Sequence, residues 1–218
     1  MKKNQSLLLK VVTILVIYFV LYYYGGSLGQ RLLYPVTLLV TFLHEFGHAL
    51  GAIVTGGHVN ALQVNPNGSG FTKTIGGNPG IILMGGYIGS AIFGNLLFYI
   101  GAKKQKWAST TLGLVGVLMA ITAFVWFNSM TSTVILLLFA AGVYAFTQYT
   151  PWEKEILMFF GLAAVLYIIQ DFNVGPSSDL RKYATTLGLF SANIWKYIWL
   201  GVVVFISFVN LRIILTGK

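Results

Sequence analysis

A series of long apolar segments, separated by shorter polar ones, limits what this chain can fold into. Seven such runs occupy residues 7–24, 32–54, 81–100, 107–127, 133–149, 156–169 and 194–215. A helix that crosses a bilayer needs about 20 mostly apolar residues, so the fifth and sixth runs are short for a span. Helices satisfy all their backbone hydrogen bonds internally, as the bilayer requires. We therefore predict an all-α integral membrane protein with six or seven transmembrane helices.

The charge content supports the same class of protein. Only 9% of residues are charged, whereas soluble domains average about 25%. The formal net charge is +9, and most basic residues lie at the ends of apolar runs, which suits contact with anionic lipid headgroups. This placement predicts a lipid bilayer as partner and argues against nucleic acid, which would require basic stripes on a soluble fold. The chain has no cysteine, so thiolate metal sites are excluded.

Two long polar segments interrupt the apolar runs. Residues 56–80 are rich in Gly, Asn, Thr and Ser, with an Asn-Pro-Asn-Gly turn signal at 65–68, and they predict a small β-hairpin over 59–75 at the membrane surface. The second segment spans 171–193. No internal repeat separates the chain into parts, and we predict a single membrane-embedded domain, residues 1–218.

The second apolar run contains the chemistry. His44 and His48 are four residues apart, so on a helix their imidazoles share one face and can bind one tetrahedral zinc ion. Glu45 lies one residue further round the helix, where its carboxylate can take a proton from a water activated by the metal. The alternative is a structural cluster of buried hydrogen bonds. We favour the metal site, because unpaired ionisable groups inside a membrane are costly and usually functional.

A His-His zinc site requires a third ligand. His58 lies too close along the chain and in a glycine-rich stretch, while Glu153 and Glu155 resemble a solvated helix start. The candidates that remain are Asp171 and Asp179. Asp179 has a second interpretation, because Ser177 or Ser178 can cap a helix whose positive end would favour the adjacent carboxylate.

The sequence His44-Glu45-Phe46-Gly47-His48 within a hydrophobic segment resembles the site-2 protease family of intramembrane zinc metallopeptidases. It is most similar to the compact bacterial branch that lacks a PDZ domain. The resemblance implies a Zn²⁺-dependent metalloendopeptidase that hydrolyses peptide bonds of membrane-anchored protein substrates, located in the bacterial cell membrane.

The family completes its zinc site with an aspartate after an Asn-x-x-Pro motif. Here Asn173 and Pro176 have that relation, and the resemblance implies Asp179 as third metal ligand and Asn173 as a catalytic residue that steadies the tetrahedral intermediate. Asp179 follows two residues sooner than in the best-known members, and Leu180 replaces the usual glycine. That departure leaves Asp171 as the alternative ligand.

Two other functions compete with proteolysis. One is a non-proteolytic metal-binding membrane protein such as a transporter, which would be expected to carry further acids or histidines along a pathway. The other is an inactive protease-like scaffold, against which the intact Glu45 argues.

Overall fold

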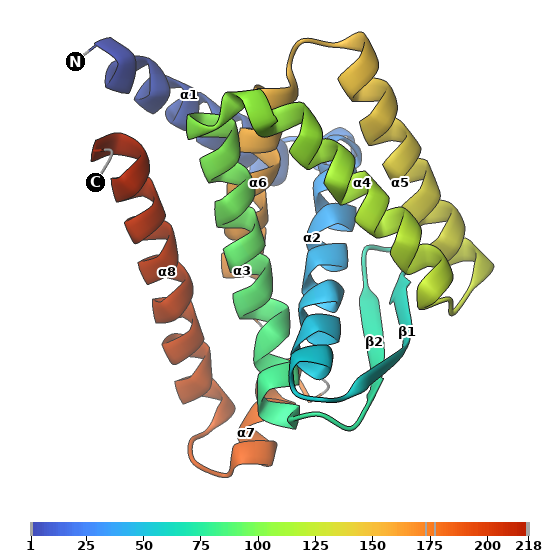
Figure 1. Ribbon diagram of the computed structural model, residues 1–218. Helices are drawn as coiled ribbons and strands as arrows, with labels where there is room; N and C mark the ends of the chain where they lie inside the picture. The colour runs from blue at the N-terminus through green and yellow to red at the C-terminus, as the bar shows by residue number, and fades with distance from the viewer. Residues whose placement is uncertain (1, 173, 177, 217–218) are drawn as a thin grey trace.

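The computed structural model describes residues 2–172, 174–176 and 178–216. In chain order (Figure 1) the elements are α1 (Lys2–Phe19), a π-helical turn (Val20–Tyr24), α2 (Gly26–Val54), β1 (His58–Val64), β2 (Gly70–Ile75), α3 (Pro79–Lys103), a 3-10 turn (Gln105–Trp107), α4 (Ala108–Val125), α5 (Met130–Tyr149), α6 (Glu153–Asp171), α7 (Asp179–Leu187) and α8 (Ala192–Thr216).

All seven apolar runs form helices, and the predicted fold class is confirmed. Six helices in the described part of the chain are long and apolar enough to cross a membrane: α1 with its π-helical turn, α2, α3, α4, α5 and α8. The sixth run, in α6, does not qualify, because Glu153, Lys154 and Glu155 begin the helix and Asp171 ends it. The short α7 adds an amphipathic helix in the second polar segment.

The helices form a bundle around α2, α3 and α6. Figure 1 shows α8 on one side of this centre and the α4–α5 pair on the other, with both termini at the same end of the molecule. The opposite end holds α7 and the start of α3, and the α4–α5 connection lies at the side of the molecule beside the hairpin. Helix α2 is largely buried along its second half, which carries the His-Glu-x-x-His sequence into the interior of the bundle.

Small residues let the central helices approach closely. A Cβ atom added to Gly47 would lie 2.1 Å from the carbonyl oxygen of Gly85, so α2 and α3 are in backbone contact there. In the same way, a Cβ at Gly161 of α6 would lie 2.6 Å from the carbonyl oxygen of Gly94 in α3. Such small-residue contacts replace the hydrophobic driving force that a membrane interior cannot supply.

An amide network joins α3 to α8. The Nδ2 group of Asn95 donates to Ser207 Oγ at 3.0 Å, and the Nδ2 group of Asn210 donates to Asn95 Oδ1 at 2.9 Å. Asn95 is buried, so these bonds satisfy polar groups that lipid could not. The role of Asn95 is therefore to bridge two helices.

Helix α1 is held against α6 by two polar contacts. Lys10 Nζ lies 2.8 Å from Glu155 Oε1, and the Tyr18 hydroxyl donates to Gln170 Oε1 at 2.9 Å. Glu153 and Glu155 begin a helix as predicted, but the carboxylate of Glu155 is partly buried and paired with a distant residue rather than solvated. Sequence spacing carries no information on a partner 145 residues away.

The predicted hairpin is confirmed as an antiparallel pair of β1 and β2. Its turn lies along α2: the Tyr34 hydroxyl donates to the carbonyl of Pro66 at 2.8 Å, and the Thr41 hydroxyl to that of Gly68 at 2.6 Å. These bonds fix the hairpin at the level of the His-Glu-x-x-His sequence.

Strand β1 is fixed to the end of α4 and the start of α5. The amide of Leu62 donates to the carbonyl of Trp126 at 3.0 Å, and the amide of Val64 donates to Ser132 Oγ at 3.0 Å. Strand β1 therefore has β2 on one side and the bonds to Trp126 and Ser132 on the other. The second edge of β2 has no strand partner within the described residues.

Candidate metal centre and active site

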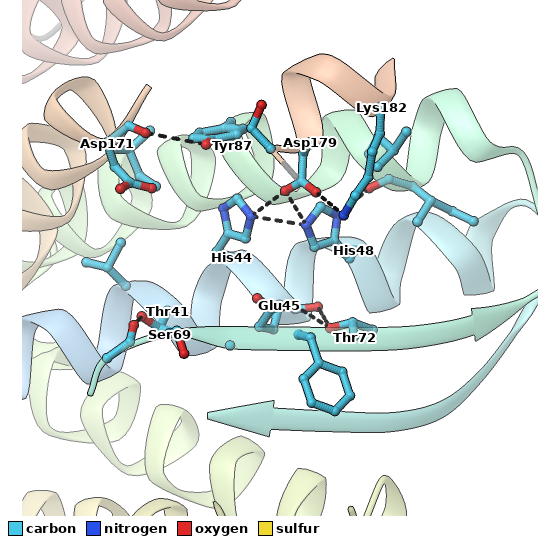
Figure 2. A pocket seen from close by; sticks show the side chains of 18 of the residues that line it. Thr41, His44, Glu45, His48, Ser69, Thr72, Tyr87, Asp171, Asp179 and Lys182 are labelled. Atoms are coloured by element: carbon cyan, nitrogen blue, oxygen red, sulfur yellow. Dashed lines mark hydrogen bonds and ion pairs between the residues drawn. The ribbon is translucent and has the colours of Figure 1, made fainter. Parts of the chain in front are cut away.

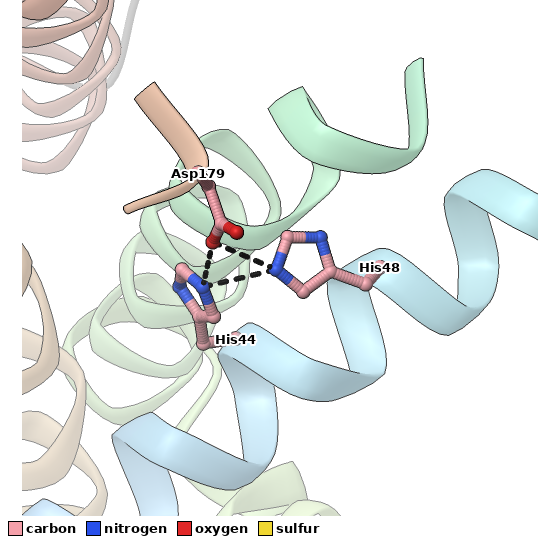
Figure 3. A group of neighbouring side chains, drawn as sticks. All are labelled: His44, His48 and Asp179. Atoms are coloured by element: carbon pink, nitrogen blue, oxygen red, sulfur yellow. Dashed lines mark hydrogen bonds and ion pairs between the residues drawn. The ribbon is translucent and has the colours of Figure 1, made fainter. Parts of the chain in front are cut away.

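Three side chains from two distant segments converge on one point (Figure 3). His44 Nε2 lies 3.0 Å from His48 Nε2 and 3.0 Å from Asp179 Oδ2, and His48 Nε2 lies 3.1 Å from the same carboxylate oxygen. The two histidines project from one face of α2, as their spacing predicts. Among the described residues, this is the group of three potential ligands that could hold a metal ion.

The start of α7 brings Asp179 to the histidines. The Ser178 hydroxyl accepts a hydrogen bond from the amide of Arg181 at 3.3 Å and so caps the helix. Asp179 is the next residue and the first of the helix. Both interpretations of Asp179 therefore hold together, since the residue stands at a capped helix start and also faces the two imidazoles.

The position of the proton on His48 favours a cation between the three side chains. His48 Nδ1 lies 2.7 Å from the carbonyl oxygen of Ile82, so this nitrogen carries the proton, and neutral His48 presents a lone pair at Nε2. That lone pair faces a carboxylate oxygen 3.1 Å away, and two acceptors at this distance repel unless a proton or a cation lies between them.

The distances also suit zinc. Zn–N and Zn–O bonds of about 2.0–2.2 Å in a tetrahedron put neighbouring donor atoms about 3.3–3.6 Å apart. The separations of 3.0–3.1 Å in the cluster are a few tenths of an ångström shorter, so a small outward movement of the side chains would accommodate the ion. Nitrogen and carboxylate ligands from three side chains are the donor set of catalytic zinc sites, which leave a fourth position open. The residues present therefore fit a zinc ion.

The carboxyl group of Asp179 needs positive charge beside it. Burial raises its pKa, but hydrogen bonds and charge from His44 and His48 in their protonated form outweigh burial and hold the pKa well below its usual range. With neutral imidazoles, a metal cation would supply that positive charge in their place. The other carboxylate oxygen, Oδ1, lies 3.5 Å from Lys182 Nζ one turn along α7. Lys182 thus faces the outer side of the carboxylate, and nothing in the sequence pattern distinguished this lysine beforehand.

Helix α3 forms the wall behind the histidines. A Cβ atom at Gly86 would lie 2.6 Å from His48 Nε2 and 2.7 Å from His44 Cε1, so only glycine leaves room for both imidazoles. The next residue, Tyr87, packs its ring edge-on against His44 with the ring centroids 4.8 Å apart. These contacts restrict the orientation of both imidazoles before any metal binds.

The cluster opens into a cavity of about 590 Å³ (Figure 2). Its lining comes from α2, β2, α3, α6 and α7 and includes Glu45, Thr72, Tyr87, Asp171 and Lys182. Glu45 is 5% exposed, and Figure 2 shows its side chain on the side of α2 that faces β2. The Thr72 hydroxyl lies 2.8 Å from Glu45 Oε2. The cavity therefore joins the candidate metal ligands, the candidate base and one strand.

The structure separates the two candidate third ligands. Asp179 contacts both imidazoles, whereas Asp171, at the end of α6, lines the same cavity without belonging to the group of ligand atoms. The proposed catalytic residue Asn173 lies outside the described residues, and its role stays a prediction. Thr72 and Lys182 are neighbours of the site that the sequence did not single out.

We expect Asp179→Asn to weaken zinc binding by at least about 100-fold, because the amide removes the negative charge that faces both imidazoles. Asp171→Asn should change zinc affinity by less than about threefold. Competition with a chromophoric chelator measures both affinities. The opposite ranking would make Asp171 the ligand and would contradict the assignment of Asp179.

Comparison with known proteins agrees with this geometry. The family model described as Peptidase M50B-like matches residues 9–210, a range that contains both segments of the candidate metal centre. Comparisons with curated proteins and with solved structures found no match. Because the family model covers nearly the whole chain, the resemblance to the site-2 protease family is confirmed, and the protein belongs to the Peptidase M50B-like family.

Proposed function

We propose that this protein is an intramembrane zinc metalloendopeptidase that cleaves membrane-anchored proteins. The observation that carries the proposal is the convergence of His44, His48 and Asp179 beside a buried glutamate, inside a bundle of membrane-length helices. His44, His48 and Asp179 hold the zinc ion, and Glu45 is the general base. Asn173 is proposed to steady the tetrahedral intermediate, as the family resemblance implies.

Zinc, when bound, supplies Lewis acidity that lowers the pKa of water and polarises a carbonyl group. The carboxylate of Glu45 accepts the proton of the attacking water and later delivers it to the leaving nitrogen of the cleaved peptide bond. His48 keeps its lone pair toward the metal because Nδ1 donates to the carbonyl of Ile82. Burial of Glu45 excludes competing bulk water from this proton transfer.

The substrate has to reach the cavity in an extended form, because a helix hides its amide bonds. Strand β2 supports such a binding mode: Gly70, Phe71, Thr72 and Thr74 line the cavity, and the second edge of the strand has no strand partner among the described residues. An extended segment of a membrane-anchored substrate can add to this edge by main-chain hydrogen bonds, which places a peptide bond near the metal centre.

Two other functions are less well supported. A transporter would need ionisable groups along a path through the membrane. In the described chain, the acids near the metal centre are Glu45, Asp171 and Asp179, and all of them line one cavity. An inactive scaffold would not need a buried glutamate beside a fitted ligand set.

The proposal also places the protein in the bacterial cell membrane and in the branch of the family without a PDZ domain.

The proposal is tested with purified protein in lipid vesicles that also contain a single-span test protein. Cleavage should depend on zinc: a chelator should abolish it, and added Zn²⁺ but not Mg²⁺ should restore it, because the donor set of two imidazoles and a carboxylate suits zinc. Gel analysis and mass spectrometry of the fragments measure cleavage. Cleavage that survives complete removal of zinc would contradict the proposed chemistry.

A further inference from the structure

One side chain outside the zinc helix contacts the candidate base directly. Thr72, on β2, places its hydroxyl oxygen 2.8 Å from Glu45 Oε2 and 2.9 Å from the backbone carbonyl oxygen of Glu45 (Figure 2). Among the described residues, Thr72 is the side chain that hydrogen-bonds the carboxylate of Glu45. The contact joins residues that lie 27 positions apart in the chain.

The strand holds this hydroxyl at a fixed place. Residues Gly70, Thr72 and Thr74 alternate with more exposed neighbours, so their side of β2 faces the cavity. At Gly70 a Cβ atom would lie 2.7 Å from Glu45 Cγ and 2.8 Å from Thr41 Cγ2. The strand therefore packs directly on the side chain of Glu45, and the hairpin is fixed to α2 on one side and to the end of α4 and the start of α5 on the other.

The hydroxyl of Thr72 has two oxygen atoms of Glu45 within hydrogen-bond distance, and this suits both the ionised and the protonated form of a general base. A hydroxyl has one proton and can also accept. When Glu45 is a carboxylate, the hydroxyl of Thr72 donates to Oε2. When Glu45 carries the proton taken from water, its own hydroxyl can donate to Thr72 Oγ1, while Thr72 donates to the backbone carbonyl of Glu45. A rotation of one hydroxyl thus serves both forms without movement of the strand.

We propose that Thr72 is a positioning residue that orients the carboxylate of Glu45 through its hydroxyl group. The proposal rests on the proposed protease function, in which Glu45 is the base. It makes the hairpin part of the active site, because the strand that offers an edge to the substrate also holds the base. A misplaced base lowers the rate of proton transfer with little effect on substrate binding.

The kinetic test compares Thr72→Val with Thr72→Ser in the vesicle assay. Valine keeps the shape of threonine and removes the hydroxyl, so kcat should fall about 10- to 100-fold while KM changes less than about twofold. Serine keeps the hydroxyl, so kcat should recover to within about threefold of the wild type. Each variant should hold one zinc ion. Thr72→Ala replaces the valine variant if the latter does not retain zinc.

A second measurement does not depend on proteolysis. The chain has three glutamates, so isotope-labelled glutamate and subtraction of the Glu45→Gln spectrum isolate the infrared carboxylate band of Glu45. The band should shift in Thr72→Val and stay in place in Thr72→Ser. It should also stay in place in Thr74→Val, which removes a hydroxyl from the same side of the same strand.

The two measurements separate the possible outcomes. A shifted band together with a lower kcat supports the positioning role. An unshifted band, or a kcat for Thr72→Val at or above the wild-type value, overturns it. If the wild type cleaves no test protein, the infrared band alone decides whether Thr72 orients Glu45, and the choice between an unsuitable substrate and an inactive scaffold is made separately with further test proteins.

Discussion

Glu45→Gln should abolish proteolysis while the protein keeps its zinc ion and its fold. Glutamine is nearly isosteric with glutamate, so the packing of α2 against β2 should barely change. The amide has no basic oxygen that can take the proton of water, and general-base catalysis contributes about 10²–10⁴-fold to such reactions. We therefore expect turnover to fall by about 10²–10⁴-fold in the vesicle assay, with one zinc ion per chain by elemental analysis.

Two comparisons make this result specific. His44→Ala and His48→Ala should also remove activity, but through loss of zinc, because each deletes one of the converging nitrogen donors. Retained cleavage by Glu45→Gln would show that another group activates the water. Loss of zinc from Glu45→Gln would instead identify the carboxylate as a ligand, and both results would contradict the role given to Glu45.

Much of the fold follows from the sequence because a bilayer leaves few choices. Apolar runs of membrane length must form helices, and all seven runs do so. The hairpin was also predictable, since the turn signal at 65–68 lies between two stretches that suit strands. Whether α6 crosses the membrane was harder to predict, because its apolar stretch is short and charged residues lie at both ends. Burial among other helices stabilises it instead.

The candidate site was predictable to the extent that it lies within one helix. His44, Glu45 and His48 have a spacing that brings two imidazoles to one face of a helix, and this information is local. The choice between Asp171 and Asp179 was left open by the residues alone, because it depends on how α7 docks against α2. The assignment of Asp179 needed the family resemblance first and the three-dimensional contacts afterwards.

Residues that act through tertiary contact gave no signal in the sequence. Thr72 is one of two threonines in the polar segment 56–80, and only the docking of β2 on α2 brings it to Glu45. Lys182 has the same character, because its distance from Asp179 matters only once the carboxylate faces the histidines. That residues 1–218 form a single domain stays a prediction.

The glycine behind the histidines gives the second large effect. Gly86→Ala should cause the loss of zinc, because the added methyl group would lie 2.6 Å from His48 Nε2 and 2.7 Å from His44 Cε1. Neither imidazole has room to retreat: His48 is buried and bonded to the carbonyl of Ile82, and His44 packs against Tyr87. Such overpacking typically costs about 1–3 kcal/mol and would separate the ligand atoms.

Gly113→Ala is the matched control, because it adds the same methyl group to another apolar helix, α4, where the added Cβ atom would meet no neighbouring segment of the described chain within 4 Å. It should keep one zinc ion and full activity, and it should gain slightly in helix propensity. Zinc content, zinc affinity and thermal unfolding of both variants distinguish loss of the metal site from general unfolding. A Gly86→Ala protein that binds zinc like the wild type would mean that α3 does not constrain the imidazoles, and the compact geometry of this metal centre would then need another origin.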